Sequence, residues 1–208
     1  MTLDVSEALS RLAQRLGGEG ATVADAGRLS GGASMETWGF AIESAAGRED
    51  LILRRRSGPF DPENARSISL GTEAALIRAA GARGAPVPAV RHVCDDADGL
   101  GEAHVMGRVS GETLGKRIVS DPRFDGVRGK LARQCGEVLA QIHATPPPPG
   151  LALKTVDGVG ELDRYEEVYR ATGANRPILE LAFQYLRRHV PEPVEPTLLH
   201  GDFRNGNL

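Results

Sequence analysis

Aromatic residues are scarce in this 208-residue sequence, at 4% of the chain, and cysteine occurs only twice. With so few aromatic rings, the core has to be built from Leu, Val, Ile and Ala. Cys94 and Cys135 show no metal-ligand spacing and indicate no disulfide framework. We expect both to pack as small apolar side chains in a reducing compartment. No stretch approaches the roughly 18 apolar residues of a membrane span.

A strong charge of either sign is also missing. The net charge of −3 gives no attraction to nucleic acid or to an anionic membrane, so we expect neither as a partner. The N-terminus has neither the basic start nor the apolar centre of a signal peptide, which predicts a cytoplasmic protein. The composition, 40% apolar and 25% charged, is that of a globular chain with one large or two small domains, and it leaves the oligomeric state open.

The most informative stretch is the last eleven residues, LLHGDFRNGNL. His200, Asp202 and Asn207 have the spacing of the protein-kinase catalytic loop, in which the Asp accepts the substrate hydroxyl proton and the Asn holds magnesium. This chemistry needs both groups on one loop, because one must reach the acceptor hydroxyl and the other a phosphate-bound metal. The alternative is a chance turn, since Gly, Asn and Asp are common in turns.

A glycine-rich turn is predicted near the N-terminus. Helical spacing indicates a helix over residues 3–16, and strand-like runs then bracket the stretch from Ser30 to Trp38. Gly31 and Gly32, next to Ser30, would let backbone amides approach a phosphate. The alternative is a plain hairpin turn.

A third strand is predicted over residues 51–56, and it ends in three arginines. Arg54 stands where the kinase pattern Val-Ala-Ile-Lys has its phosphate-binding lysine, and no lysine precedes Lys116. We therefore predict Arg54 as the phosphate-binding cation, with Arg56 as the second candidate. An arginine can hold a phosphate through two nitrogens, but it is bulkier than lysine. The alternative is a basic strand end that faces water.

Residues 69–81 have helical spacing, and Glu73 lies on the apolar side of that helix beside Leu70 and Ile77. A carboxylate that faces inward needs a partner. The kinase arrangement pairs this glutamate with the phosphate-binding cation, so we expect Glu73 to pair with Arg54. The alternative is a boundary glutamate that reaches solvent.

A fifth strand is predicted over residues 103–106 and contains His104 and Met106. In kinase-like folds the chain that leaves this strand, here at Gly107, is the hinge whose backbone binds the adenine edge. His104 and Met106 are therefore counted among the nucleotide-binding candidates. The assignment depends on chain order, because backbone recognition has no side-chain signature.

The predicted domain boundary follows this strand. Residues 1–106 form a nucleotide-binding lobe, and residues 107–208 form a helical lobe that ends in the catalytic loop. Apolar spacing predicts helices over 128–145, 161–170 and 176–190. The side chains expected to face inward on the last helix are Ile178, Leu181, Ala182, Tyr185 and Leu186.

Taken in order, these features resemble the aminoglycoside phosphotransferase and choline kinase family of the protein-kinase-like superfamily, over roughly residues 20–208. The strongest feature is His-Gly-Asp-x4-Asn, in which Gly201 replaces the protein-kinase arginine. The resemblance implies an α+β, two-lobe fold: an antiparallel five-stranded N-lobe with one helix, then a mostly helical, here incomplete, C-lobe. It also implies transfer of the γ-phosphate of ATP or GTP, with Mg²⁺, to a hydroxyl of an aminoglycoside-, choline- or hydroxyacyl-like small molecule.

By this resemblance Asp202 is the base or hydroxyl-orienting group and Asn207 is the magnesium ligand. Arg54 and Glu73 form the phosphate clamp. The other implied nucleotide-binding residues are Ser30, Gly31, Gly32, His104 and Met106. Antibiotic kinases hold polycationic sugars with acidic residues of the helical lobe, so Glu166 and Glu167 are substrate candidates, with a solvated helix face as the alternative.

The sequence ends one residue after Asn207. The second metal ligand implied by the resemblance, an Asp on the following strand, has no residue here to provide it. We therefore expect this sequence to be part of a longer protein or a truncated product. An alternative function is a non-catalytic nucleotide-binding pseudokinase, which the arginine at position 54 also favours. A purely structural domain leaves the spacing of Asp202 and Asn207 without a reason.

Overall fold

The computed structural model of the protein describes residues 5–29, 35–61 and 67–207. These residues form two units. The first takes in the described residues up to Ala152 and those from Thr197 onward, and the second is Leu153–Pro196. The predicted boundary after residue 106 stays a prediction.

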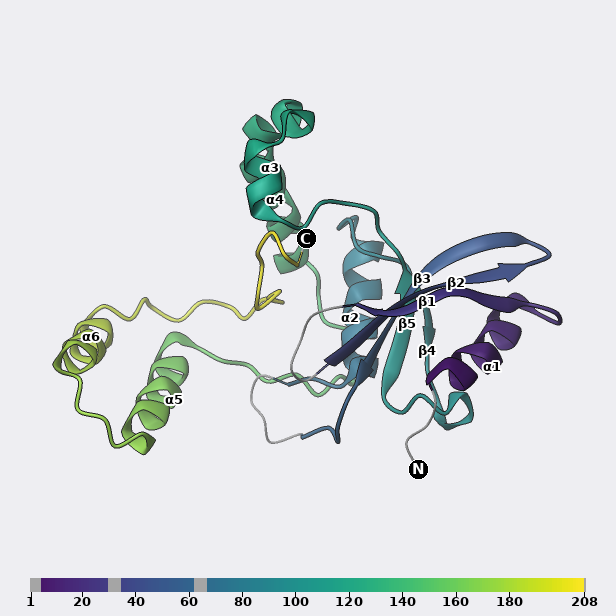
Figure 1. Ribbon diagram of the computed structural model, residues 1–208. Coiled ribbons are helices and arrows are strands. Elements are labelled where there is room, and N and C mark those ends of the chain that lie inside the picture. The colour runs from purple at the N-terminus through teal and green to yellow at the C-terminus, as the bar shows by residue number, and fades with distance from the viewer. Residues whose placement is uncertain (1–4, 30–34, 62–66, 208) are drawn as a thin grey trace. The chain divides into compact units, whose positions relative to one another are not determined.

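The first unit contains a five-stranded sheet in which every neighbouring pair is antiparallel (Figure 1). The spatial order is β1-β2-β3-β5-β4. The strands are β1 Thr22–Leu29, β2 Met35–Ser44, β3 Gly47–Arg56, β4 Val90–Val93 and β5 Ala103–Gly107. With the helices described next, this confirms the predicted α+β fold with its antiparallel five-stranded sheet.

Helix α1 (Val5–Gly17) covers one face of the sheet through its apolar stripe. Leu9 and Leu12 are completely buried against Leu53 and Val105, which the alternation of a strand points to the same side. The core therefore consists mainly of aliphatic side chains, as the shortage of aromatic residues requires.

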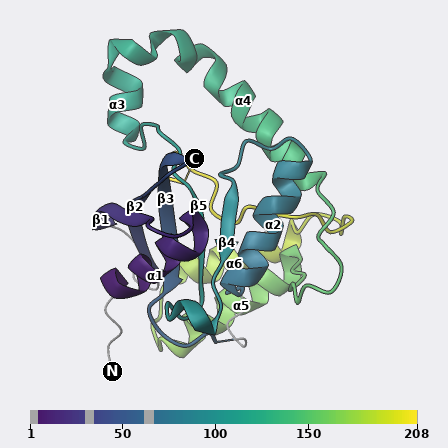
Figure 2. The ribbon, with the colours of Figure 1, turned by 90° about the vertical axis from the view of Figure 1, so that its right-hand side faces the viewer.

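Helix α2 (Leu70–Ala82) packs against β4 and β5 and lies on the other side of the sheet from α1 (Figures 1 and 2). It begins at an N-cap, Ser69, whose Oγ accepts a hydrogen bond from the backbone N–H of Thr72 at 3.0 Å. This cap fixes the first turn of α2 and therefore the position of Glu73, one residue further on.

The chain after β4 forms a short 3₁₀ helix, η1 (Asp96–Asp98), before it enters β5. After β5 come α3 (Gly115–Ser120), which the sequence analysis did not predict, η2 (Pro122–Phe124) and α4 (Asp125–His143). The helix predicted over 128–145 is thus confirmed and begins earlier. Among the described residues of α4, only Ile142 is buried.

The second unit is a pair of helices, α5 (Gly158–Ala171) and α6 (Pro177–Arg188). Tyr169 packs against Phe183 with ring centroids 5.7 Å apart. The expectation that α6 turns its apolar side chains inward is wrong: Ile178, Leu181, Tyr185 and Leu186 are 49–71% exposed. The reason is that two helices share a single line of contact, which covers only part of an apolar stripe this wide.

No helix within the described ranges combines the length and the apolarity needed to cross a membrane.

Candidate functional site

The register of the sheet brings the predicted phosphate clamp together. Arg54 on β3 pairs with His104 on β5, and both side chains point to the face that α2 covers. Arg54 Nε lies 2.8 Å from Glu73 Oε1, so the predicted pairing of these two residues is confirmed. The contact is an ion pair rather than an aligned hydrogen bond. The Arg54 side chain remains 34% exposed, and among the described residues its two terminal nitrogens contact no other charged group.

The structure distinguishes Arg54 from its neighbours. The Arg56 side chain is 8% exposed, and its Nε donates to Glu102 Oε2 at 2.6 Å. Another Arg56 nitrogen donates to the Ile68 carbonyl at 2.8 Å. Arg55 points to the opposite face, where its Nε lies 3.7 Å from Glu36. Of the two arginines that β3 turns to the α2 face, Arg54 is therefore the one whose outer nitrogens are available to a ligand.

His104 lies directly behind the clamp and is completely buried. Its Nε2 is 4.0 Å from Glu73 Oε1, and neither ring nitrogen has a hydrogen-bond partner among the described residues. Burial lowers the pKa of His104; the Glu73 carboxylate opposes this shift and the Arg54 charge adds to it. The ring is therefore neutral near pH 7. It supports the clamp from within the lobe and has no exposed surface for a ligand.

Met106 lies at the end of β5 opposite Ile52 and is half-buried, so its place on the strand that enters the predicted hinge is as expected. The other nucleotide-binding predictions, Ser30, Gly31 and Gly32, lie outside the described residues. Their role and the role of Met106 stay predictions.

The predicted catalytic loop, residues 200–207, begins with a sharp turn. Gly201 has a φ of +81°, a left-handed conformation that glycine adopts without strain. The backbone N–H of Asp202 points to His200 Nδ1 at 3.4 Å. This turn explains why a glycine rather than an arginine precedes the Asp in this loop.

The loop brings Asp202 and Asn207 into contact. Asn207 Nδ2 donates to Asp202 Oδ2 at 2.7 Å and to the Asp202 backbone carbonyl at 2.9 Å. A further bond, from the Asn207 N–H to the Arg204 carbonyl at 2.8 Å, closes the turn between them. The Asp202 side chain is 66% exposed, so its carboxylate is accessible to a substrate.

Apolar contacts anchor this loop in the first unit. Leu198 and Phe203 pack against a small cluster formed by Ala80 of α2, Ala85 and Ile142 of α4. His200 meets the Phe203 ring edge-on at 5.4 Å. The exposed polar residues of the loop thus lie on both sides of Phe203, the apolar residue that holds the loop in place.

The acidic helix proposed to bind a polycationic substrate is already neutralised. Glu166 is 2.9 Å from Arg170 and 2.6 Å from Arg187, and both arginines lower its pKa. These residues line an open depression with Asp163 and Glu167. The ion pairs favour the alternative reading, a solvated helix face.

Sequence reasoning missed two residues of the site. Glu102 binds Arg56 and also accepts from the Leu70 N–H, so it joins β3 to the start of α2. Arg204 lies 3.3 Å from the Asp202 carboxylate. The antiparallel register could have identified Glu102, since pairing Arg54 with His104 places Arg56 opposite residue 102. No comparable signal could have identified Arg204, because a loop has no strand pairing from which its neighbours can be deduced.

Comparison with known proteins agrees with this geometry. The sequence model of the phosphotransferase enzyme family matches residues 25–208. The mouse (Mus musculus) protein acyl-CoA dehydrogenase family member 10 is 28% identical over 172 residues. That match covers 76% of this chain and 15% of the mouse protein, so this chain spans about 15% of the length of that relative.

Proposed function

The chain belongs to the phosphotransferase enzyme family, and on that basis we propose that it transfers the γ-phosphate of ATP to a hydroxyl group of a small molecule. Membership of the family implies phosphotransferase chemistry. The nucleotide, the metal and the class of acceptor are the parts that we add as a proposal.

The observation that carries the proposal is the contact between Asp202 and Asn207 on one exposed loop. Asp202 presents its carboxylate to solvent at a point where an acceptor hydroxyl could approach. In phosphoryl transfer such a carboxylate orients the hydroxyl and accepts its proton. Arg204, at 3.3 Å, offers positive charge beside it.

The loop also fits a magnesium ion. Mg²⁺ prefers oxygen ligands and keeps several waters when one or two protein groups bind it. Asn207 uses its amide nitrogen to hold Asp202, which leaves the amide oxygen free to bind a metal. A magnesium ion there would neutralise phosphate charge, while Asp202 acts on the acceptor.

The clamp fits a nucleotide phosphate. Glu73 binds Arg54 through Nε, the inner nitrogen of the guanidinium. The two outer nitrogens form the fork that binds phosphate oxygens in pairs. The buried, neutral His104 ring behind Glu73 limits how far the carboxylate can retreat from Arg54. We propose that Arg54 does the work of the usual lysine.

Two observations bear on the acceptor. The carboxylate of Glu166 is occupied by arginines, which gives a polycationic aminoglycoside less to bind. The mouse relative is named for acyl-CoA chemistry, although the match covers a small part of it. We therefore place hydroxyacyl compounds ahead of aminoglycosides, choline-like amines and sugars as candidate acceptors.

A two-step experiment tests the proposal on the full-length protein. Thermal-shift screening with Mg²⁺-ATP and Mg²⁺-GTP, each with the four acceptor classes, identifies the ligands that stabilise it. Phosphorus NMR of the best pair then looks for a new phosphate ester and for ADP or GDP in equal amounts. A nucleotide that binds without any ester formation contradicts the proposal and supports the pseudokinase, the alternative that the arginine at position 54 favours. If no nucleotide binds, both functions are excluded.

A further inference from the structure

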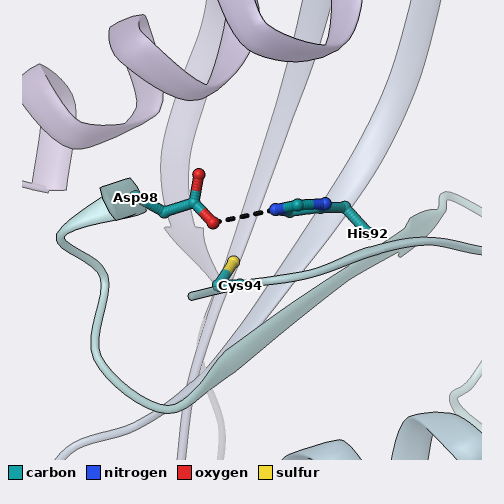
Figure 3. A group of neighbouring side chains, drawn as sticks. All are labelled: His92, Cys94 and Asp98. Carbon is teal, nitrogen blue, oxygen red and sulfur yellow. Dashed lines mark hydrogen bonds and ion pairs between the residues drawn. The ribbon is translucent and has the colours of Figure 1, made fainter. Parts of the chain in front are cut away.

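A second group of chemically reactive side chains lies at the β4 edge of the sheet, two strands away from β3 and its arginines. His92 is on β4, Cys94 follows that strand directly, and Asp98 is the last residue of η1. His92 Nε2 and Asp98 Oδ2 are 2.8 Å apart. The Cys94 sulfur points toward both (Figure 3), and the three donor atoms lie within 4.8 Å of one another.

We propose that His92, Cys94 and Asp98 bind a zinc-like divalent cation. The set offers one nitrogen, one sulfur and one oxygen donor, the three ligand types that Zn²⁺ accepts in proteins. Three protein ligands leave one position for water or another ligand. The sequence analysis expected no metal ligand at Cys94, because His-x-Cys-x3-Asp matches no familiar zinc spacing and converges only when η1 folds back onto β4.

The charge of the site balances. A bound thiolate and carboxylate neutralise a dication, which allows the ion to lie among partly buried groups. The Asp98 side chain is 2% exposed and Cys94 packs against the main core. Burial, with the Asp98 and Asp95 charges adding to it, raises the pKa of the Cys94 thiol to about 12. Without metal the thiol is therefore protonated.

The surroundings hold the carboxylate in place. Arg15 of α1 donates to Asp98 Oδ1 at 2.8 Å, and the Asp95 backbone N–H donates to Asp98 Oδ2 at 2.9 Å. Such outer contacts orient metal ligands. They also oppose burial and hold the pKa of Asp98 below its ordinary value, together with the bond from His92. The Cys94 backbone is fixed by a bond from its N–H to the Ala103 carbonyl at 3.0 Å.

The alternative is a purely structural role, in which the hydrogen bond between His92 and Asp98 joins η1 to β4. This role explains two of the three residues. It does not explain a thiol directed at the same point. Metal binding accounts for all three: the thiol proton leaves to solvent, and the imidazole binds the ion through Nε2 and keeps a proton on Nδ1.

The test is a Co²⁺ titration of the chelator-treated full-length protein, followed by competition with Zn²⁺. We expect one equivalent of Co²⁺ to give a thiolate-to-cobalt charge-transfer band. Cys94→Ser should remove the band and weaken Zn²⁺ binding on the order of 100-fold or more. The matched control, Cys135→Ser on α4, should change neither. Phosphoryl transfer is not needed for any of these readouts.

Two further measurements keep the proposal testable if Cys94→Ser does not fold. His92→Gln should weaken Zn²⁺ binding and shift the thiolate-to-cobalt band, because the thiolate stays and one nitrogen ligand is lost. In the unaltered protein, Zn²⁺ should protect Cys94 but not Cys135 from alkylation, as mapped by mass spectrometry. Absence of the band, a band that survives Cys94→Ser, or equal alkylation of both cysteines with and without Zn²⁺ would overturn the assignment.

Discussion

The sheet of the first unit and the helix pair of the second use apolar residues and ion pairs in opposite ways. In the sheet, aliphatic side chains such as Leu53 are completely buried under α1, and the partly buried Arg56–Glu102 pair lies on the opposite face, next to the start of α2. In the helix pair, Leu181 is 61% exposed, and Arg170 and Arg187 lie with their acidic partners at the surface. The same kinds of residue therefore contribute differently to stability in the two units.

The difference shows where this protein can hold a charge in a defined position. The register of β3 and β5 places Arg54 next to His104, and α2 packs on β5, so Arg54 lies beside Glu73 before any ligand arrives. The surface ion pairs of α5 and α6 join mobile side chains in water, where each pair is worth little. The sheet is thus suited to a preorganised site, and the helix pair is not.

The largest expected difference concerns the core. Leu53→Ala should reduce the free energy of unfolding by about 2–5 kcal/mol, because it leaves a cavity in the interior. Leu181→Ala on α6 should change it by about 0.5 kcal/mol or less. In a urea titration the fluorescence of the single tryptophan, Trp38 on β2, reports unfolding of the sheet, and far-ultraviolet circular dichroism reports unfolding of the helix pair. Equal losses for the two variants would remove the contrast.

The buried anchor comes next. Glu102→Gln removes the charge that binds Arg56 and weakens the contact to the Leu70 N–H, so it should cost about 1–3 kcal/mol. Its counterpart in the helix pair, Glu180→Gln, loses an exposed partner of Arg170 and should leave the melting temperature nearly unchanged. Thermal unfolding of both variants in the same buffer makes the comparison. A larger loss for Glu180→Gln would show that the surface network is the stronger one.

A third test separates two neighbouring arginines within the sheet. Arg54→Gln should weaken Mg²⁺-ATP binding about 10- to 100-fold, because a charged phosphate contact is lost, with little change in melting temperature. Arg56→Gln should do the reverse, since its nitrogens are used within the fold. Calorimetric titration of each variant supplies the affinities. If Arg56→Gln alone weakens nucleotide binding, the phosphate contact belongs to Arg56.

The smallest expected effect concerns how the free energy of unfolding changes at acidic pH. Arg15, through its hydrogen bond, lowers the pKa of Asp95 from 3.8 to about 2. A depressed carboxyl pKa stabilises the fold above the unfolded value, and this contribution disappears as the pH falls from about 4 to 2. Asp95→Asn should therefore flatten that part of the stability curve, as should Arg15→Gln. A wild-type slope retained in both variants would mean that other carboxyl groups produce it.

Local periodicity assigned Arg54 to one face of its strand and Glu73 to the apolar side of its helix. The antiparallel five-stranded sheet and the pairing of Arg54 with Glu73 were predicted from the resemblance to the kinase arrangement, and in the structure the packing of α2 on β5 brings the two residues together. The loop with Asp202 and Asn207 was recognised because their spacing is that of the protein-kinase catalytic loop.

What the sequence could not predict depends on distant segments. The exposure of Ile178 and Leu181 on α6 is set by how much surface a neighbour covers, which apolar spacing does not encode. Cys94 was predicted to be a packing residue. Its approach to Asp98 depends on the turn of η1 and on the hydrogen bond from Arg15 of α1 to Asp98, and the sequence shows neither. A helix as short as α3, with six residues, contains too few turns to show the repeated apolar spacing by which longer helices are recognised.

The measurement that tests the central claim most directly compares phosphoryl transfer by the wild-type protein and by Asp202→Asn, with the acceptor found in the screen. We expect the variant to lose ~10²–10⁴ in rate, because the group that accepts the hydroxyl proton is gone. Nucleotide affinity should stay within a few fold, since Asn207 and the clamp are intact. A variant that keeps most of the wild-type rate would contradict the assignment of Asp202 and of the loop as the catalytic site.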